Sequence, residues 1–151
     1  MKADPSKRFI LGSIILFATL PVFANPLLKY EWQNRPLLLF APDNEDKRLV
    51  QLLATLQKSN CDIDDRDMII AVLLAEGQSR LNNNNISAQD AALIRKRYEI
   101  EPSQFAVLLI GKDGGEKYRL FAVPELNEIF SLIDGMPMRQ DEMQENLKDC
   151  H

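Results

Sequence analysis

The chain contains two cysteines, Cys61 and Cys150, and its one histidine, His151, is its last residue. A thiol becomes a reactive thiolate where a helix N-terminus or a nearby cation lowers its pKa, and neither cysteine lies at an expected helix start. In an oxidising compartment, two cysteines of a small domain can instead form a disulfide that closes a long loop. The sequence leaves three outcomes open: a Cys61–Cys150 disulfide, pairing with another chain, and unpaired thiols. Catalytic schemes that depend on histidine have no ordered candidate for the base.

A cluster of acidic and amide side chains follows the apolar run that ends at Phe40. We name it the acidic corner, and it consists of Pro42, Asp43, Asn44, Glu45 and Asp46. Such a cluster could bind a cation or a basic peptide, but the same residue types also cap helices and favour the positive end of the helix dipole. We expect capping to dominate. Pro42, Asp43, Asn44 and Asp46 are nevertheless the first surface to test for binding.

Two other sets of side chains are of types that bind metals, but their spacing does not match a known metal site. Asp62, Asp64 and Asp65 alternate loosely like a calcium loop, but the glycine and the bidentate glutamate that an EF-hand needs are missing. The soft ligands that would suit cuprous copper are Met136, Met138, Met143, Cys150 and His151. Solvation of the acidic loop and core packing by the methionines explain these residues more simply. The sequence therefore predicts no metal site and no cofactor.

The charge balance argues against a nucleic-acid partner. The 151 residues have a formal net charge of −4, and the first 24 of them are net positive, so the rest of the chain is more acidic still. Nucleic-acid binders need clustered lysine and arginine to displace counterions. The one basic run, Arg95 to Arg97, is expected to be a solvated helix face.

The first 24 residues have the pattern of a secretory signal peptide. Lys2, Lys7 and Arg8 precede a largely apolar run of 12 residues from Phe9 to Leu20, and small residues stand at Val22 and Ala24. As a helix this run would cover ~18 Å, well short of the ~30 Å core of a bilayer. We therefore expect cleavage after Ala24, no membrane span afterwards, and a periplasmic or secreted protein.

The remaining chain alternates between apolar runs and amphipathic stretches. Short apolar runs predict strands at 35–40, 67–74 and 105–110. The turn signal at Asp113-Gly114 predicts a returning, more polar strand at 116–123. Leucine or mixed apolar stripes at helical spacing predict helices at about 43–59, 87–101 and 124–135. Ser87 and Asp90 form a start that resembles a capping box. The polar stretch 77–85, with four consecutive asparagines, is expected to be an irregular surface loop.

This order, β-α-β-α-β-β-α, predicts an α/β fold with a thioredoxin-like core. It consists of a mixed four-stranded sheet with helices on both faces. Strands separated by helices favour parallel pairing, and the last hairpin adds one antiparallel strand. We expect the domain to span residues 25–138 and a charged C-terminal tail to occupy 139–151.

Four segments resemble a particular family: NPLLKYEWQNRPLLLFAP, DRDM, FAVLLIGKDGGEK and LIDGMPMRQDEM. They are similar to the thioredoxin-like domain of unknown function found in bacterial exported proteins. A related domain occurs in vertebrate sushi-repeat and equarin-type matrix proteins. The resemblance implies the thioredoxin-like fold and export, and it brings no established activity.

The resemblance also shows what is missing compared with a redox-active thioredoxin. There, a Cys-x-x-Cys pair follows the first strand at a helix N-terminus, which lowers a thiol pKa. The acidic corner occupies that place here, and it contains no sulfur. Phe105 and Ala106 stand nearest the place of the usual cis-proline.

We therefore expect a non-catalytic module that binds another protein or an envelope component. The alternative is an atypical thiol or peroxide-handling enzyme that uses Cys61, and a metal-binding C-terminal tail is a weaker third hypothesis.

Overall fold

The computed structural model describes residues 25–145. The expected signal peptide and the end of the expected tail, which includes Cys150 and His151, lie outside them. The elements follow in the order η1 (Leu28–Tyr30), β1 (Arg35–Ala41), α1 (Lys47–Lys58), α2 (Asn60–Asp65), β2 (Met68–Leu74), β3 (Arg80–Leu81), β4 (Asn84–Asn85), α3 (Ala88–Arg97), β5 (Ala106–Ile110), β6 (Glu116–Leu120), α4 (Leu126–Asp134) and α5 (Pro137–Glu145).

The strands form one mixed sheet in the order β4-β3-β2-β1-β5-β6. Strands β2, β1, β5 and β6 are the predicted thioredoxin-like core, and β1 and β2 are parallel as expected. The parallel pairing expected for the third core strand is wrong, because β5 runs antiparallel to β1. The last turn of α3 lies at the C-terminal ends of β1 and β2, where Arg95 bonds to Ala41 and Leu73. The chain therefore enters β5 from that end and has to run in the direction opposite to β1 and β2.

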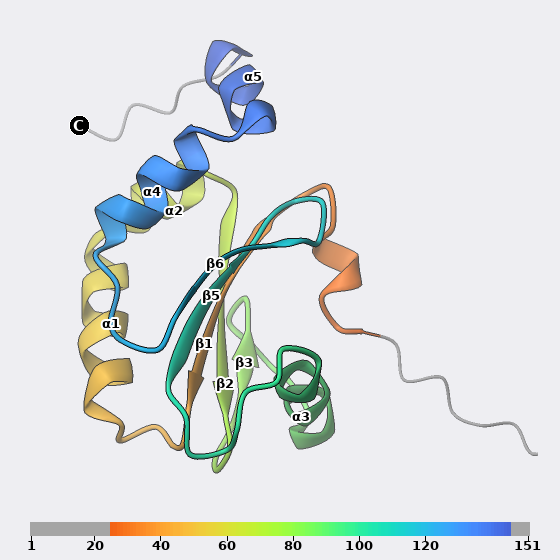
Figure 1. The fold of residues 1–151 in the computed structure, drawn as a ribbon, viewed down its shortest axis with the longest axis vertical. Coiled ribbons are helices and arrows are strands. Elements are labelled where there is room, and N and C mark those ends of the chain that lie inside the picture. Colours follow the sequence, from red (N-terminus) through yellow and green to blue (C-terminus); the bar gives the residue numbers. More distant parts are fainter. Residues whose placement is uncertain (1–24, 146–151) are drawn as a thin grey trace, which may run out of the picture.

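Helices cover both faces of the sheet, as predicted (Figure 1). Helices α1, α2 and α4 lie on one face, where the expected stripes of α1 and α4 are buried. Their buried residues are Leu49, Leu52, Leu56, Leu126, Ile129, Phe130 and Ile133. Helix α3 and the segment containing η1 lie on the other face, where Ala91, Ile94 and Tyr98 are buried as expected. Because β1 is covered on both faces, all seven of its residues are buried.

The expected irregular loop at 77–85 is instead a short β-hairpin made by β3 and β4. Asn82 and Asn83 form its turn with φ angles of 48° and 64°. Two consecutive left-handed residues are the requirement of a type I′ turn, and asparagine tolerates them better than most residues. The run of asparagines therefore marks a hairpin, which extends the sheet beyond β2.

The expected acidic loop after Cys61 is helical as well. Residues Asn60–Asp65 form α2, in which Ile63 is buried. Asp67 then takes a positive φ of 48° and turns the chain into β2.

Trp32 lies in the segment that leads from η1 into β1. Its φ of 64° is unusual for a bulky residue. Its backbone N–H donates to the carbonyl of Lys112 at 2.6 Å, and its side chain is 66% exposed. The tryptophan is therefore fixed through its main chain and presents its ring to solvent.

Helical structure continues beyond residue 138, where we expected the domain to end. Residues Pro137–Glu145 form α5, in which Arg139 is only 2% exposed. No helix within residues 25–145 is long and apolar enough to cross a membrane.

Candidate functional site

The acidic corner turns out to be the capped start of α1. Asp46 is the N-cap, and its carboxylate accepts from the backbone N–H of Arg48 at 2.9 Å. The same carboxylate pairs with the Arg48 guanidinium at 2.5 Å. The side-chain hydrogen bond from Arg48 is the main reason why the pKa of Asp46 lies below its usual value. Because α1 begins at Lys47, Asp46 lies just before the first turn of the helix.

The other residues of the corner are only partly available. Asp43 accepts from the backbone N–H of Glu45 at 2.8 Å, and Pro42 is half-buried. Asn44 and Glu45 are exposed. The corner thus contains one carboxylate engaged by Arg48 and one engaged by the main chain. Binding of a partner at the exposed residues of the corner stays a prediction.

A buried arginine lies beneath the ends of β1 and β2. Arg95 is 7% exposed, which contradicts the expected solvated face for the run Arg95 to Arg97. Its guanidinium donates to the carbonyls of Ala41 (3.0 Å), Leu73 (2.8 Å) and Glu101 (3.0 Å). Burial lowers the pKa of Arg95 from its usual value. The cation therefore ties α3 to the end of the sheet.

A groove opens from Asn44 and runs between α1 and the β3–β4 hairpin. It consists of two hollows of about 270 and about 390 Å³, which share Leu53, Val72 and Arg80 as lining residues. We name the pair the α1 groove. Its apolar lining includes Leu49, Leu53, Leu56, Ile63, Ile70, Val72 and Leu74. It exists because the hairpin widens the sheet beyond the part that α1 covers.

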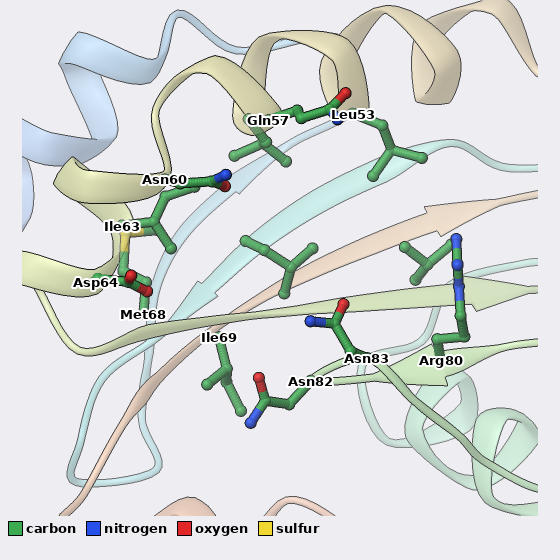
Figure 2. Close-up of a pocket in the computed structure, with 13 residues that line it drawn as sticks. Leu53, Gln57, Asn60, Ile63, Asp64, Met68, Ile69, Arg80, Asn82 and Asn83 are labelled. Carbon is green, nitrogen blue, oxygen red and sulfur yellow. The ribbon is translucent and has the colours of Figure 1, made fainter.

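Amide side chains surround this apolar lining. They are Asn44, Gln57, Asn60, Gln78, Asn82, Asn83 and Asn85. Figure 2 shows Gln57 and Asn60 on the helical side of the first hollow, facing Asn82 and Asn83 on the hairpin side. The charged residues of the lining are Asp64 and Arg80.

Sequence reasoning missed the groove because it missed the hairpin. The asparagine run that forms the turn also supplies part of the polar rim of the groove. This run was the one signal in the sequence that could have indicated the groove. The groove joins the predicted binding set only at Asn44, because Pro42, Asp43 and Asp46 are not among its lining residues.

Cys61 lies in α2, on an exposed position away from the acidic corner. No cysteine within residues 25–145 is a free thiol. Cys150, one of the partners that the sequence leaves open for Cys61, lies outside the described residues, so a Cys61–Cys150 disulfide stays a hypothesis.

The candidate copper ligands Cys150 and His151 lie outside the described residues. Within residues 25–145 there is no group of three histidine, cysteine, aspartate or glutamate side chains that could hold a metal ion. Met136 packs against the core, whereas Met138 is 41% exposed. Asp65 is paired with Arg139 instead of facing a cation site.

The four family-like segments meet in a network of charged groups at the end of the sheet opposite to the acidic corner. We name this network the basal ion cluster. Its cations are Arg35, Arg66, Lys112 and Arg139, and its main carboxylates are Asp65, Asp67, Asp134 and Glu142. The four segments indicated a family in the sequence but not that their charged residues meet. A charged residue inside an apolar motif, such as Arg35 at the start of a buried strand, was the signal that could have indicated the cluster.

Glu142 of α5 is the centre of this cluster. Its two carboxylate oxygens accept from the Arg35 guanidinium at 3.0 Å each, and one of them also accepts from Lys112 at 2.7 Å. Burial opposes ionisation of Glu142, yet the hydrogen bonds from Arg35 and Lys112 keep its pKa below the usual value. Arg139 bonds to Asp65 and Asp134. The cluster therefore fastens α5 to β1, α2, α4 and the β5–β6 turn.

Comparisons with solved structures agree on the fold. The chain resembles the reduced 2-Cys peroxiredoxin of Plasmodium vivax with a TM-score of 0.59 and 17% identity, over 83% of this chain and 76% of that one. It also resembles the mitochondrial 2-Cys peroxiredoxin of Plasmodium falciparum, with a TM-score of 0.56 and 12% identity, over 82% and 84% of the two chains. At these identities the likeness shows a thioredoxin-like fold alone.

Curated relatives are longer proteins that contain one similar region. The chain is 28% identical over 136 residues to coiled-coil domain-containing protein 80 of Danio rerio, covering 79% of this chain and 16% of that protein. It is 28% identical over 117 residues to the human sushi repeat-containing protein SRPX2, covering 76% and 25%. The chain thus spans a quarter or less of the length of these two proteins.

The family comparison covers nearly the whole described chain. The model of a family described as a domain of unknown function, DUF4174, matches residues 26–142. This range includes every charged residue named in the basal ion cluster and ends inside α5. The chain is therefore a member of the DUF4174 family, whose domain has a thioredoxin-like fold.

Proposed function

We propose that this chain is an exported, non-catalytic domain that binds another protein or a component of the cell envelope. The observation that carries the proposal is the acidic corner. Where a redox-active thioredoxin holds its thiols, this chain has a capped helix start without sulfur, and a groove opens beside it at Asn44.

Export is supported by the basic and apolar pattern of residues 1–24. The use of a similar region in sushi repeat-containing proteins supports a binding role by analogy. The overall acidity of the chain argues against nucleic acid as the partner.

The proposal is tested by affinity capture from an envelope extract with the exported chain, followed by mass spectrometry. A matched variant, Asn44→Arg with Glu45→Lys, changes the exposed part of the corner and leaves the Asp46 cap intact. Lys96→Glu, on the exposed side of α3, is the control. We expect the wild type and the control to retain the same partner in stoichiometric amount and the corner variant to retain less of it.

The redox alternative is tested on the same preparations. Turnover of hydrogen peroxide or of a disulfide substrate, measured with dithiothreitol as reductant, should stay at the background rate for the wild type. Turnover that disappears in a Cys61→Ser variant would replace the binding proposal with an enzyme. Failure to retain any partner, together with background turnover, would remove the support for the binding module.

A further inference from the structure

We propose that the α1 groove receives an extended peptide segment of a partner protein, in which a carboxylate stands between two apolar side chains. This inference rests on the proposed binding function and assigns to it a surface and a ligand chemistry. The occupant follows from three properties of the groove: its length, the order of its apolar and charged parts, and its amide rim.

The groove has the length of a short strand. Met68 lines one end of it and Leu74 lines the other, so it follows the whole of β2. Seven residues of extended chain cover ~20 Å. The hairpin pairs with β2 at Ala71 and Val72, and the Asn82 backbone N–H donates to the Ile70 carbonyl. Met68 and Ile69, beyond these contacts, also line the groove. An extended segment of about six residues therefore fits alongside β2.

The two hollows lie on either side of a shared centre. Leu53, Val72 and Arg80 border both of them. Leu56 and Ile63 line only the first hollow, and Leu49 and Leu74 line only the second. Each hollow therefore suits one apolar side chain. Binding would bury apolar surface of both partners away from water, which stabilises the complex.

Arg80 places a positive charge between the hollows. It is exposed, and within residues 25–145 its guanidinium has no carboxylate partner. Figure 2 shows its side chain rising from β3 past the strand layer towards the α1 side. In this acidic chain, Arg80 is the one cation of the groove lining. A carboxylate of the occupant would satisfy it through a charge-assisted, bidentate hydrogen bond.

The amide rim suits a peptide main chain. Gln57 and Asn60 face Asn82 and Asn83 across the first hollow. Each amide side chain offers two donors and an acceptor, which matches the N–H and C=O groups of an extended segment. The amide rim adds no net charge, so the charge preference comes from the charged lining residues. Arg80 borders both hollows, whereas Asp64 borders only the first, so the centre of the groove favours a carboxylate.

The test is a selection from a random dodecapeptide library displayed on phage, performed with the wild-type chain and with Arg80→Glu. Lys96→Glu carries the same change of charge on the opposite face and serves as the control. We expect the wild type and the control to enrich peptides with a central aspartate or glutamate flanked by apolar residues. We expect Arg80→Glu to enrich lysine or arginine at that central position.

Affinity is then measured by fluorescence anisotropy with the best wild-type peptide. Arg80→Ala should weaken binding about ten- to hundredfold, the range for loss of a hydrogen bond to a charged group. Gln57→Trp, an exposed substitution on α1, should fill the first hollow and weaken binding without lowering the melting temperature. Selection of the same peptides by wild type and Arg80→Glu, or no enrichment over the input library, would overturn the inference.

Failure of the groove and failure of the proposed function give different results. If Arg80→Glu retains the same envelope partner as the wild type, the chain binds but the α1 groove does not receive the ligand. Retention of a glycan in place of a protein likewise overturns the peptide occupant and leaves the envelope-binding function standing. If the wild type retains nothing, the proposed function fails as well.

Discussion

The guanidinium of Arg95 lies beneath the ends of β1 and β2, where it bonds to main-chain carbonyls of three separate segments. It also lies over the ring of Phe40, 5.4 Å from the ring centroid. Its acceptors in these bonds are dipoles, and the pKa of Arg95 is lowered by burial alone. Such a site depends on several hydrogen bonds at once, because a buried charge without them is strongly unfavourable.

Replacing Arg95 tests this role at the residue scale. Arg95→Met keeps an apolar stem but leaves the carbonyls of Leu73 and Glu101 without their bond to the guanidinium. We expect the free energy of unfolding to fall by about 2 kcal/mol, measured by urea denaturation. Lys96→Met, one residue along and exposed, should change it by less than about 0.5 kcal/mol. Equal effects of the two substitutions would contradict the structural role of Arg95.

At the scale of an element, α5 is unusual in how it is attached. Its one buried residue is Arg139, and its partners in the basal ion cluster come from β1, α2, α4 and the β5–β6 turn. The helix is therefore fixed mainly by charge. Removing one partner of a buried ion pair is costly because it leaves the other partner uncompensated.

The pH dependence of α5 follows from Glu142. Its pKa is lowered in the folded chain, so its contribution to stability is complete above the unfolded pKa of ~4.3 and is lost as the pH falls through the folded pKa. We expect Glu142→Gln to reduce the free energy of unfolding by about 2 kcal/mol at pH 7. The difference from the wild type should shrink steadily as the pH falls below the unfolded pKa of ~4.3.

The control for this prediction is Glu145→Gln, which changes an exposed carboxylate at the end of α5. It should follow the wild type at every pH. Urea denaturation at a series of pH values measures all three proteins. A difference between Glu142→Gln and wild type that persists unchanged in acid would show that the ion pairs with Arg35 and Lys112 do not hold α5.

At the scale of the whole molecule, the predicted Cys61–Cys150 disulfide would join α2 to the end of the chain. We expect non-reducing peptide mapping of the exported protein to find Cys61 and Cys150 in one linked peptide. Reduction should then lower the free energy of unfolding by about 4 kcal/mol, because the closed loop spans most of the domain. A Cys61→Ser, Cys150→Ser double variant should match the reduced wild type and respond to no reductant. Two thiols titrated in the unfolded, unreduced protein would refute the disulfide.

The core of the molecule could be predicted from the sequence because burial and periodicity specify it. The apolar run of β1 and the stripe of α4 can face only inward, and both were predicted correctly. Ser87 and Asp90 also cap α3 as their spacing indicates.

The errors fall where long-range contacts decide the conformation. The direction of β5 depends on where α3 ends in space, and the hairpin at Asn82-Asn83 depends on pairing with β2. The burial of Arg95 depends on carbonyls that lie 22 and 54 positions away in the chain. The α1 groove depends on the pairing of the hairpin with β2, so the sequence indicated only the end of the groove at Asn44.

Trp32 has a practical consequence for anyone who studies this protein by optical spectroscopy. It is the one tryptophan of the chain, and its ring is already largely in water in the folded state. Its emission should therefore hardly change in colour on unfolding, and fluorescence would make a poor denaturation monitor. The same property makes it a good reporter of contact. Its main chain is bonded to Lys112, so a blue shift on adding a partner would mean that this surface, at the opposite end from the acidic corner, has become covered.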